Sequence, residues 1–139
     1  ALVRGSAASV HEYMFAHAAQ HERLYNVNNP FAFHGAEIAY AFDIRELTPS
    51  GGGEYGDERE LAVAVSDYWV RFAASGNPNP AGTSDAGLVT WPEFSARNVS
   101  LLIAASGEGG IRAVPDLHGA VCAFWDTQAQ RNSCSAGLL

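Results

Sequence analysis

The sequence FAFHGAEIAYAF, residues 31–42, surrounds one histidine with aromatic residues and sets a glycine directly after it. Glycine adopts tight-turn conformations that other residues avoid, so we expect His34 at the tip of a loop. A short helical turn over Glu37–Phe42 is predicted to hold that loop in place. The imidazole titrates near neutral pH, which suits general acid–base chemistry. Taken by itself, His34 fits a structural histidine bonded to a backbone carbonyl better than a catalytic one.

The segment before this loop is predicted to be a strand followed by an irregular stretch. Val10–His17 is short, and its valine, tyrosine and phenylalanine favour a strand. Ala18–Phe33 is predicted to be a long loop, because asparagines and a proline interrupt any regular period. Its aromatic residues favour a packed loop with a function.

The clearest helix is predicted for Asp57–Ser75, after a flexible connection at Ser50–Gly53. Four apolar residues recur at helical spacing along it: Leu61, Val65, Tyr68 and Phe72. Acidic residues fill its first turn, where the helix dipole favours them. Gly76 is predicted to end the helix, and Pro78 prevents its continuation.

The C-terminal third is predicted to contain a hairpin and a last helix. Val99–Ala104 and Ile111–Val114 are apolar enough for two strands, and the glycine-rich residues 106–110 suit the connection. Asp116 is predicted to be the N-cap of the last helix. Its expected apolar face consists of Leu117, Val121, Phe124 and Trp125, and the tail after Gln130 is expected to be loose.

The composition indicates one domain with a modest hydrophobic core. The chain has 139 residues, of which 47% are apolar, and this excludes a disordered tail. Its formal charge of −7 argues against nucleic acid or an anionic membrane as a partner. No apolar run approaches the length of a bilayer span, and no signal peptide is recognised. The chain begins at Ala1 with apolar sequence, so we expect further sequence before it.

Four short motifs occur in an informative order. The histidine stretch is followed by YWVRFA leading into SGNPNP (residues 68–80), by Trp91–Pro92 and by CAFW (residues 122–125). In order and spacing these motifs resemble the C-terminal part of the type-B carboxylesterases, the cholinesterase-like branch of the α/β-hydrolases. The resemblance extends from about Val10 to Trp125.

The resemblance implies an α/β fold, namely the C-terminal portion of an α/β-hydrolase with an incomplete sheet and helices packed on it. Residues 1–139 would form the C-terminal part of a carboxylesterase domain. In such enzymes the serine of a Gly-x-Ser-x-Gly turn precedes the acid, and the histidine comes last. This chain contains no Gly-x-Ser-x-Gly sequence. The N-terminal part, with the nucleophile and the acid, is therefore expected outside these residues.

The resemblance also suggests roles for the residues around His34, which becomes the histidine of the catalytic triad. Phe31 and Phe33, with Tyr40, would contact the acyl or alcohol part of an ester, or would instead pack to stiffen the loop. Glu37 is not expected to be the triad acid, because the family takes its acid from an earlier loop. It would cap the turn or pair with a cation, and a supporting role behind the histidine stays open.

Neither a metal nor an organic cofactor is predicted. His17 and His21 have a spacing that could chelate zinc from a helix, but no third ligand lies close in the sequence. Cys122 is a buried thiol or, by resemblance to the cholinesterases, half of a disulfide with a cysteine upstream of Ala1. Five further aromatic residues are expected to serve packing: Trp69, Phe72, Trp91, Phe124 and Trp125.

The function that the resemblance implies is that of a serine carboxylesterase, which hydrolyses carboxylic esters through an acyl-enzyme. Its partners would be a small-molecule ester and the rest of the α/β-hydrolase domain, and the chain alone is expected to be inactive. One alternative is a non-catalytic cholinesterase-like adhesion or binding module. Another is a small free-standing binding domain.

Overall fold

The computed structural model describes residues 9–19, 31–45, 58–79, 88–94 and 98–135, with side chains described up to residue 129. In chain order the elements are β1 (Tyr13–Phe15), α2 (Ile38–Ala41), α3 (Glu58–Ser75), β2 (Val99–Ile103), the 3-10 helix η1 (Ser106–Glu108), β3 (Arg112–Pro115) and α4 (Gly119–Ser135). The predicted connection at Ser50–Gly53 and most of the predicted loop Ala18–Phe33 lie outside the described residues.

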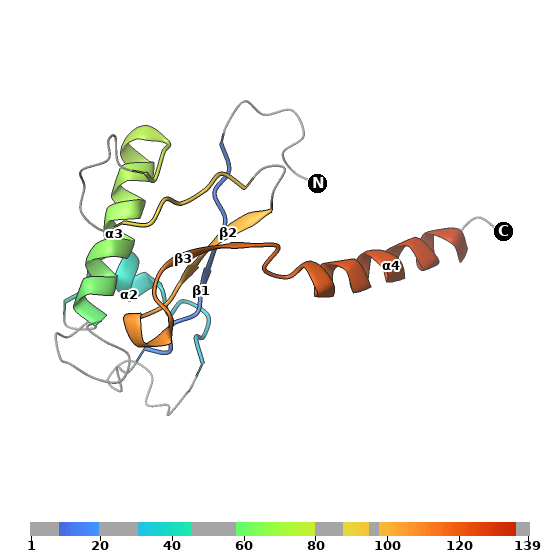
Figure 1. The fold of residues 1–139 in the computed structure, drawn as a ribbon, viewed down its shortest axis with the longest axis horizontal. Helices are drawn as coiled ribbons and strands as arrows, with labels where there is room; N and C mark the ends of the chain where they lie inside the picture. The colour runs from blue at the N-terminus through green and yellow to red at the C-terminus, as the bar shows by residue number, and fades with distance from the viewer. Residues whose placement is uncertain (1–8, 20–30, 46–57, 80–87, 95–97, 136–139) are drawn as a thin grey trace.

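The three strands form a mixed sheet in the order β1-β2-β3. β1 and β2 run parallel, with Tyr13 opposite Leu101 and Phe15 opposite Ile103, whereas β2 and β3 are antiparallel. Parallel neighbours need a long crossover, and α2 and α3 lie between β1 and β2 in the chain. In Figure 1, α2 and α3 lie together beside the sheet, and α4 extends away from the rest of the molecule. The described part of the chain is thus a small mixed sheet with helices, consistent with part of an α/β fold.

β2 and β3 confirm the predicted hairpin. Both strands begin and end within one residue of the predicted bounds. The connection contains η1 and then Gly109 and Gly110, whose φ angles are 95° and 69°. Only glycine adopts such left-handed angles without strain, which is why the glycine-rich connection suits this turn.

α3 confirms the predicted long helix and supplies much of the core. Leu61, Val65 and Tyr68 are buried as the spacing predicts, and Phe72 is 46% exposed near the C-terminal end. Gly76 ends the helix in a left-handed conformation, with φ of 74°. The core that forms between α2, α3 and the sheet consists of Ala39, Tyr40, Leu61, Ala62, Val65, Tyr68, Trp91, Leu101, Ile103 and Ala105.

β1 is shorter than the predicted strand Val10–His17, because only three of its residues pair with β2. Backbone bonds continue at both ends, where Leu101 donates to the carbonyl of Glu12 (2.9 Å) and Ala16 donates to that of Ile103 (2.8 Å). Beyond them the chain leaves the sheet, and His17 turns into the protein interior, where it is fully buried.

The last helix is confirmed, but its predicted N-cap is wrong. Asp116 has a φ of 52°, and its backbone N–H donates to the carbonyl of Asn98 (2.8 Å). This bond extends the β2–β3 pairing, so Asp116 still belongs to the hairpin, and α4 begins at Gly119. The helix continues to Ser135, which contradicts the loose tail expected directly after Gln130.

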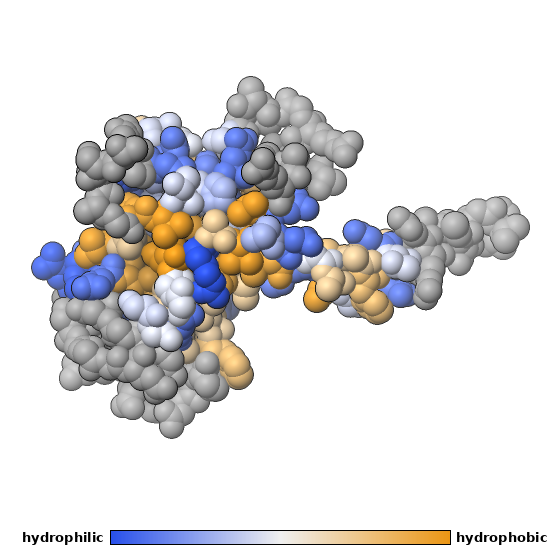
Figure 2. All heavy atoms as spheres, viewed as in Figure 1, coloured by the Kyte–Doolittle hydropathy of each residue, from blue (hydrophilic) through white to orange (hydrophobic). Residues whose placement is uncertain are grey.

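The apolar side chains of α4 are exposed, which contradicts the packing expected for Phe124 and Trp125. Val121, Phe124 and Trp125 are 57%, 55% and 63% exposed. Cys122 is a free, exposed thiol, so the buried-thiol alternative is wrong, and a disulfide to a cysteine outside the chain stays a prediction. Figure 2 shows apolar residues at the surface of α4 as well as around α3 and the strands.

Candidate functional site

His34 lies in a run of tight turns that leads directly into α2. The Ala36 N–H donates to the carbonyl of Phe33 (3.0 Å), and the Ile38 N–H donates to that of Gly35 (3.2 Å). Gly35 has a φ of 83°, which a residue with a side chain adopts only under strain. The predicted loop tip is therefore a hydrogen-bonded turn, and the His34 side chain is exposed on it.

α2 confirms the short helical turn predicted over Glu37–Phe42 and ties the histidine turn to the core. Ala39 and Tyr40 are buried, and the Tyr40 ring packs 5.0 Å from that of Phe15 on β1. Burial, together with the neighbouring carboxylates of Glu58 and Glu108, raises the pKa of the Tyr40 phenol, so this side chain stays neutral. The turn of His34 is thus connected to the sheet through one buried tyrosine.

An ion pair fixes the C-terminal end of α2 to α3. The Arg59 guanidinium donates to both carboxylate oxygens of Asp43, with a distance of 2.6 Å between Nη2 and Oδ2. Such two-pronged pairing restrains orientation as well as distance. The Arg59 hydrogen bond also holds the pKa of Asp43 below its usual value. Two contacts therefore hold the segment that follows His34: the burial of Tyr40 in the core and the ion pair of Asp43 with Arg59.

The other predicted site residues share this segment without forming a common cluster. Phe31 is 73% exposed, and Phe33 is half-buried. Tyr40 is fully buried, which favours the packing alternative over a wall of an open site. Glu37 occupies the N-cap position of α2, but its side chain makes no capping hydrogen bond, so the predicted capping role is wrong. After burial, its charge is the second cause that raises the pKa of Tyr13.

A buried ionisable cluster around His17 was not predicted from the sequence. The His17 ring is flanked by Glu58, 3.1 Å from Nε2, and by Glu108, 2.8 Å from Nδ1. These glutamates lie 41 and 91 residues away in the chain, so local spacing could not reveal them. One signal was available: Glu58 precedes Leu61 by three residues and therefore shares the apolar face of α3.

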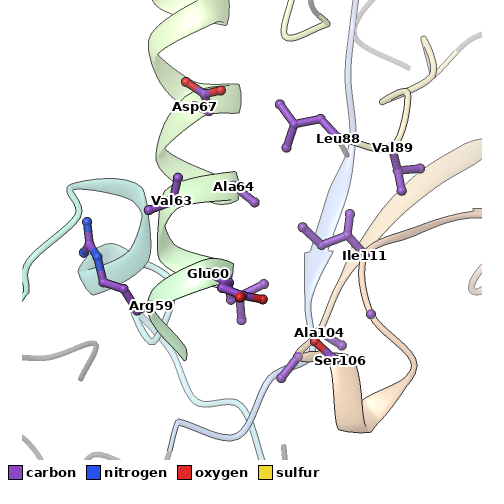
Figure 3. A pocket seen from close by; sticks show the side chains of 13 residues that line it. Arg59, Glu60, Val63, Ala64, Asp67, Leu88, Val89, Ala104, Ser106 and Ile111 are labelled. Carbon is purple, nitrogen blue, oxygen red and sulfur yellow. The ribbon is translucent and has the colours of Figure 1, made fainter. Parts of the chain in front are cut away.

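Two cavities lie near the core. The larger, of about 520 Å³, lies between α3 and the segments that carry Leu88 and Ile111 (Figure 3). Its polar lining includes Arg59 and Asp67, which pair with Asp43 and Arg71 respectively. The smaller, of about 180 Å³, is lined by His11, Tyr13, Tyr68, Trp69, Phe72 and Trp91. His34 lines neither cavity, so neither one is an extension of the histidine turn.

The described residues contain no group of three or more histidine, cysteine, aspartate or glutamate side chains arranged to hold a metal ion. Both ring nitrogens of His17 face carboxylates, and His21 lies outside the described ranges. Among the described helices, none is long and apolar enough to span a membrane.

The resemblance seen in the motif order is confirmed by comparison with known protein families. The model of the carboxylesterase family matches residues 2–125, and this chain belongs to that family. The family implies the α/β-hydrolase fold, and the esterases among its homologues support a carboxylic ester hydrolase as the parent protein.

Individual relatives are similar at modest identity. The chain is 31% identical to acetylcholinesterase from Bungarus fasciatus over 99 residues, which are 67% of this chain and 14% of that protein. It is 32% identical to carboxylesterase 1C from Mus musculus over 99 residues, 71% of this chain and 16% of that protein. It is 34% identical to carboxylesterase 1D from Rattus norvegicus over 92 residues, 66% of this chain and 14% of that protein. The chain therefore spans a small part of the relatives it matches.

Proposed function

We propose that residues 1–139 form the C-terminal part of a serine carboxylesterase domain and that His34 is the histidine of its catalytic triad. The observation that carries this proposal is the position of His34. It is an exposed imidazole on a hydrogen-bonded turn, in a sequence context shared with the carboxylesterase family. A general base needs such fixed placement, because proton transfer depends on a short, well-oriented contact.

The nucleophilic serine and the acid of the triad come from an N-terminal part of the domain. The chain has no Gly-x-Ser-x-Gly sequence, and it matches 10% to 18% of the lengths of its relatives. The sheet supports the same view, because β1 has a strand partner on one edge only among the described residues. An edge strand can pair with a further strand, as the incomplete sheet of this proposal requires.

The chemistry assigned to His34 is proton transfer in both halves of ester hydrolysis. The serine oxygen attacks the ester carbonyl carbon, and His34 takes the hydroxyl proton. When the bond to the alcohol breaks, His34 delivers that proton to the leaving oxygen, and the acyl group stays on the serine. A water molecule then attacks the acyl carbon, gives its proton to His34 and releases the acid, and the serine oxygen regains a proton.

Phe31 and Phe33 are proposed to contact the ester. Phe31 and Phe33 precede His34 by three residues and by one, and the exposed ring of Phe31 offers apolar surface for an acyl or alcohol group. Glu37, one helical turn after His34, is proposed to support the site electrostatically as a carboxylate near the imidazole. Ester selectivity depends on residues of the N-terminal part.

The test is substitution of His34 in the protein that joins this chain to the N-terminal part of the domain. His34→Ala is expected to lower kcat for p-nitrophenyl acetate by roughly 10⁴-fold or more, because triad residues act as a unit. KM is expected to change little, since the imidazole acts mainly in the transition state.

His118→Ala is the matched control, because His118 is an exposed histidine in the turn directly before α4, far in the chain from the turn that carries His34. It is expected to retain parental kcat, and circular dichroism establishes that both variants fold. A kcat of His34→Ala within tenfold of the parent would overturn the assignment.

A further inference from the structure

The His17 cluster has a geometry that requires an extra proton. Nδ1 lies 2.8 Å from Glu108 Oε2, and Nε2 lies 3.1 Å from Glu58 Oε1. An ionised carboxylate only accepts hydrogen bonds, and a neutral imidazole has a single N–H to donate. Both contacts are hydrogen bonds at the same time only if the ring is a doubly protonated imidazolium or if one carboxyl group is protonated.

The surroundings of Glu108 favour its ionised form. Besides the His17 ring, the backbone N–H of Ala105 donates to Oε2 (3.2 Å), and that of Ala18 donates to Oε1 (3.4 Å). Hydrogen bonds from several donors stabilise a carboxylate against protonation. Glu108 is therefore ionised, and the extra proton lies on His17 or on Glu58. Against the effect of burial, the hydrogen bonds and charges of both glutamates raise the pKa of His17, which favours the imidazolium between two carboxylates.

Among the described residues, the titratable groups placed against the His17 ring come from three elements. They are Glu58 on α3, Glu108 in η1 and the Tyr40 phenol on α2. Burial by itself lowers the pKa of His17, but the hydrogen bonds and charges of the two glutamates outweigh it and raise the pKa above 6.5. The described residues around the ring include no cation that would oppose this shift.

The cluster contacts the element that carries His34. The rings of His17 and Tyr40 pack edge to face, 5.6 Å apart at 88°. Tyr40 lies in α2, which continues directly from the His34 turn. Glu58 is followed in the chain by Arg59, whose guanidinium holds Asp43 at the end of the same segment. The position of α2 therefore depends on the cluster at two points.

We propose that His17 is a positioning residue: as a buried imidazolium between Glu58 and Glu108, it sets the place of Tyr40 and α2 and thereby of His34. The inference rests on the proposed catalytic function of His34 for its effect on activity. The proposed charge of the His17 cluster does not depend on that function.

The first measurement is the melting temperature between pH 6 and pH 9, in the protein that joins this chain to the N-terminal part of the domain. A group whose folded pKa is raised stabilises the fold fully below its unfolded value, here 6.5, and loses that contribution as the pH rises through the folded pKa. The melting temperature of the parent should exceed that of His17→Gln most at pH 6, and the difference should shrink as the pH rises. The control, His118→Gln, should follow the parent at every pH.

A difference between the parent and His17→Gln that stays constant across this pH range would overturn the buried imidazolium. Glu108→Gln provides a second variant should His17→Gln fail to fold. Its amide can donate to a neutral ring, so the alkaline loss of stability should shrink or move to lower pH. An unchanged alkaline loss in Glu108→Gln would equally contradict the proposal.

The second measurement is the pH profile of kcat, at a temperature well below melting. If His17 positions His34, kcat of the parent should fall as His17 loses its proton at alkaline pH. His17→Gln should have a kcat lowered at least tenfold, little change in KM and no such alkaline fall. The positioning role would be overturned if His17→Gln lost the pH-dependent part of the stability but still showed the parental fall of kcat at alkaline pH. An inactive parent, or an active His34→Ala variant, would instead refute the proposed function, and the melting data would still decide the state of His17.

Discussion

α3 and α4 are helices of 18 and 17 residues whose apolar side chains lie in opposite surroundings. α3 buries Val65 and Tyr68 against the sheet, whereas α4 leaves Val121 and Trp125 more than half exposed. Both helices have apolar residues at helical spacing, so the spacing alone does not determine burial. A helix face is buried only where another element covers it, and the described part of the chain provides that cover for α3 alone.

The largest difference in the free energy of unfolding is expected between substitutions of an aromatic residue on α3 and one on α4. Tyr68→Ala should destabilise the chain by roughly 3–5 kcal/mol, because it opens a cavity in the core. It also removes the hydroxyl that donates to the carbonyl of Val89 (2.5 Å). Trp125→Ala should change the free energy of unfolding by no more than about 0.5 kcal/mol, since the ring is 63% exposed. Urea unfolding of the 139-residue chain, followed by circular dichroism, measures both.

The same pair of variants tests what covers α4. In the protein that includes the N-terminal part of the domain, Trp125→Ala should cost more than it does in the 139-residue chain, if that part packs on α4. An equal, small cost in both proteins would show that α4 stays uncovered, and it would count against this role of the N-terminal part.

The same substitution of a valine on each helix is expected to give a smaller difference in the free energy of unfolding. Val65 is fully buried and Val121 is 57% exposed. Val65→Ala should lower the free energy of unfolding by about 1.5–3 kcal/mol, the value expected for burial of such a side chain. Val121→Ala should leave it within about 0.5 kcal/mol of the parent. Similar costs for the two variants would mean that α4 packs in solution, contrary to the exposure described.

The smallest expected effect concerns the ion pair that joins α2 to α3. The pKa of Asp43 is lowered by Arg59, so its contribution is present above the unfolded value of 3.8 and is lost as the pH falls through the folded pKa. Asp43→Asn should therefore melt below the parent near neutral pH, and the two melting curves should converge in acid.

Asp126→Asn is the matched control on α4, where the aspartate is exposed. Substitution of this exposed side chain should change the melting temperature little. If Asp43→Asn and Asp126→Asn changed the melting temperature by the same pH-dependent amount, the Asp43–Arg59 pair would not be the cause.

Local sequence patterns predicted the elements whose causes are local. α3 follows from the spacing of Leu61, Val65 and Tyr68, and the end of that helix follows from Gly76. The hairpin and the turn before α2 follow in the same way from their glycines. Asp116 failed as an N-cap because its pairing with Asn98 keeps it in the hairpin, and the helix begins only at Gly119. Such a tertiary contact overrides a local preference.

The features that were missed depend on residues far apart in the chain. His17 meets Glu108 across 91 residues, and no spacing rule connects them. In the sequence the nearest histidine to His17 is His21, and their spacing pointed to a metal instead of to the distant glutamates. The candidate site around His34 stays a prediction, which rests on motifs that carry information about a family rather than about geometry.

The parallel pairing of β1 with β2 has a consequence for the order in which the chain folds. Ser100 donates to the Glu12 carboxylate across 88 residues, so β1 meets its partner only late in synthesis. At ~5–20 residues per second, a ribosome needs about 4–18 s to make the intervening chain. The β2–β3 hairpin closes within microseconds of its own completion. The nascent strand around Tyr13 therefore stays unpaired with β2 for seconds and exposes apolar side chains. A chaperone would bind the chain most usefully in this interval.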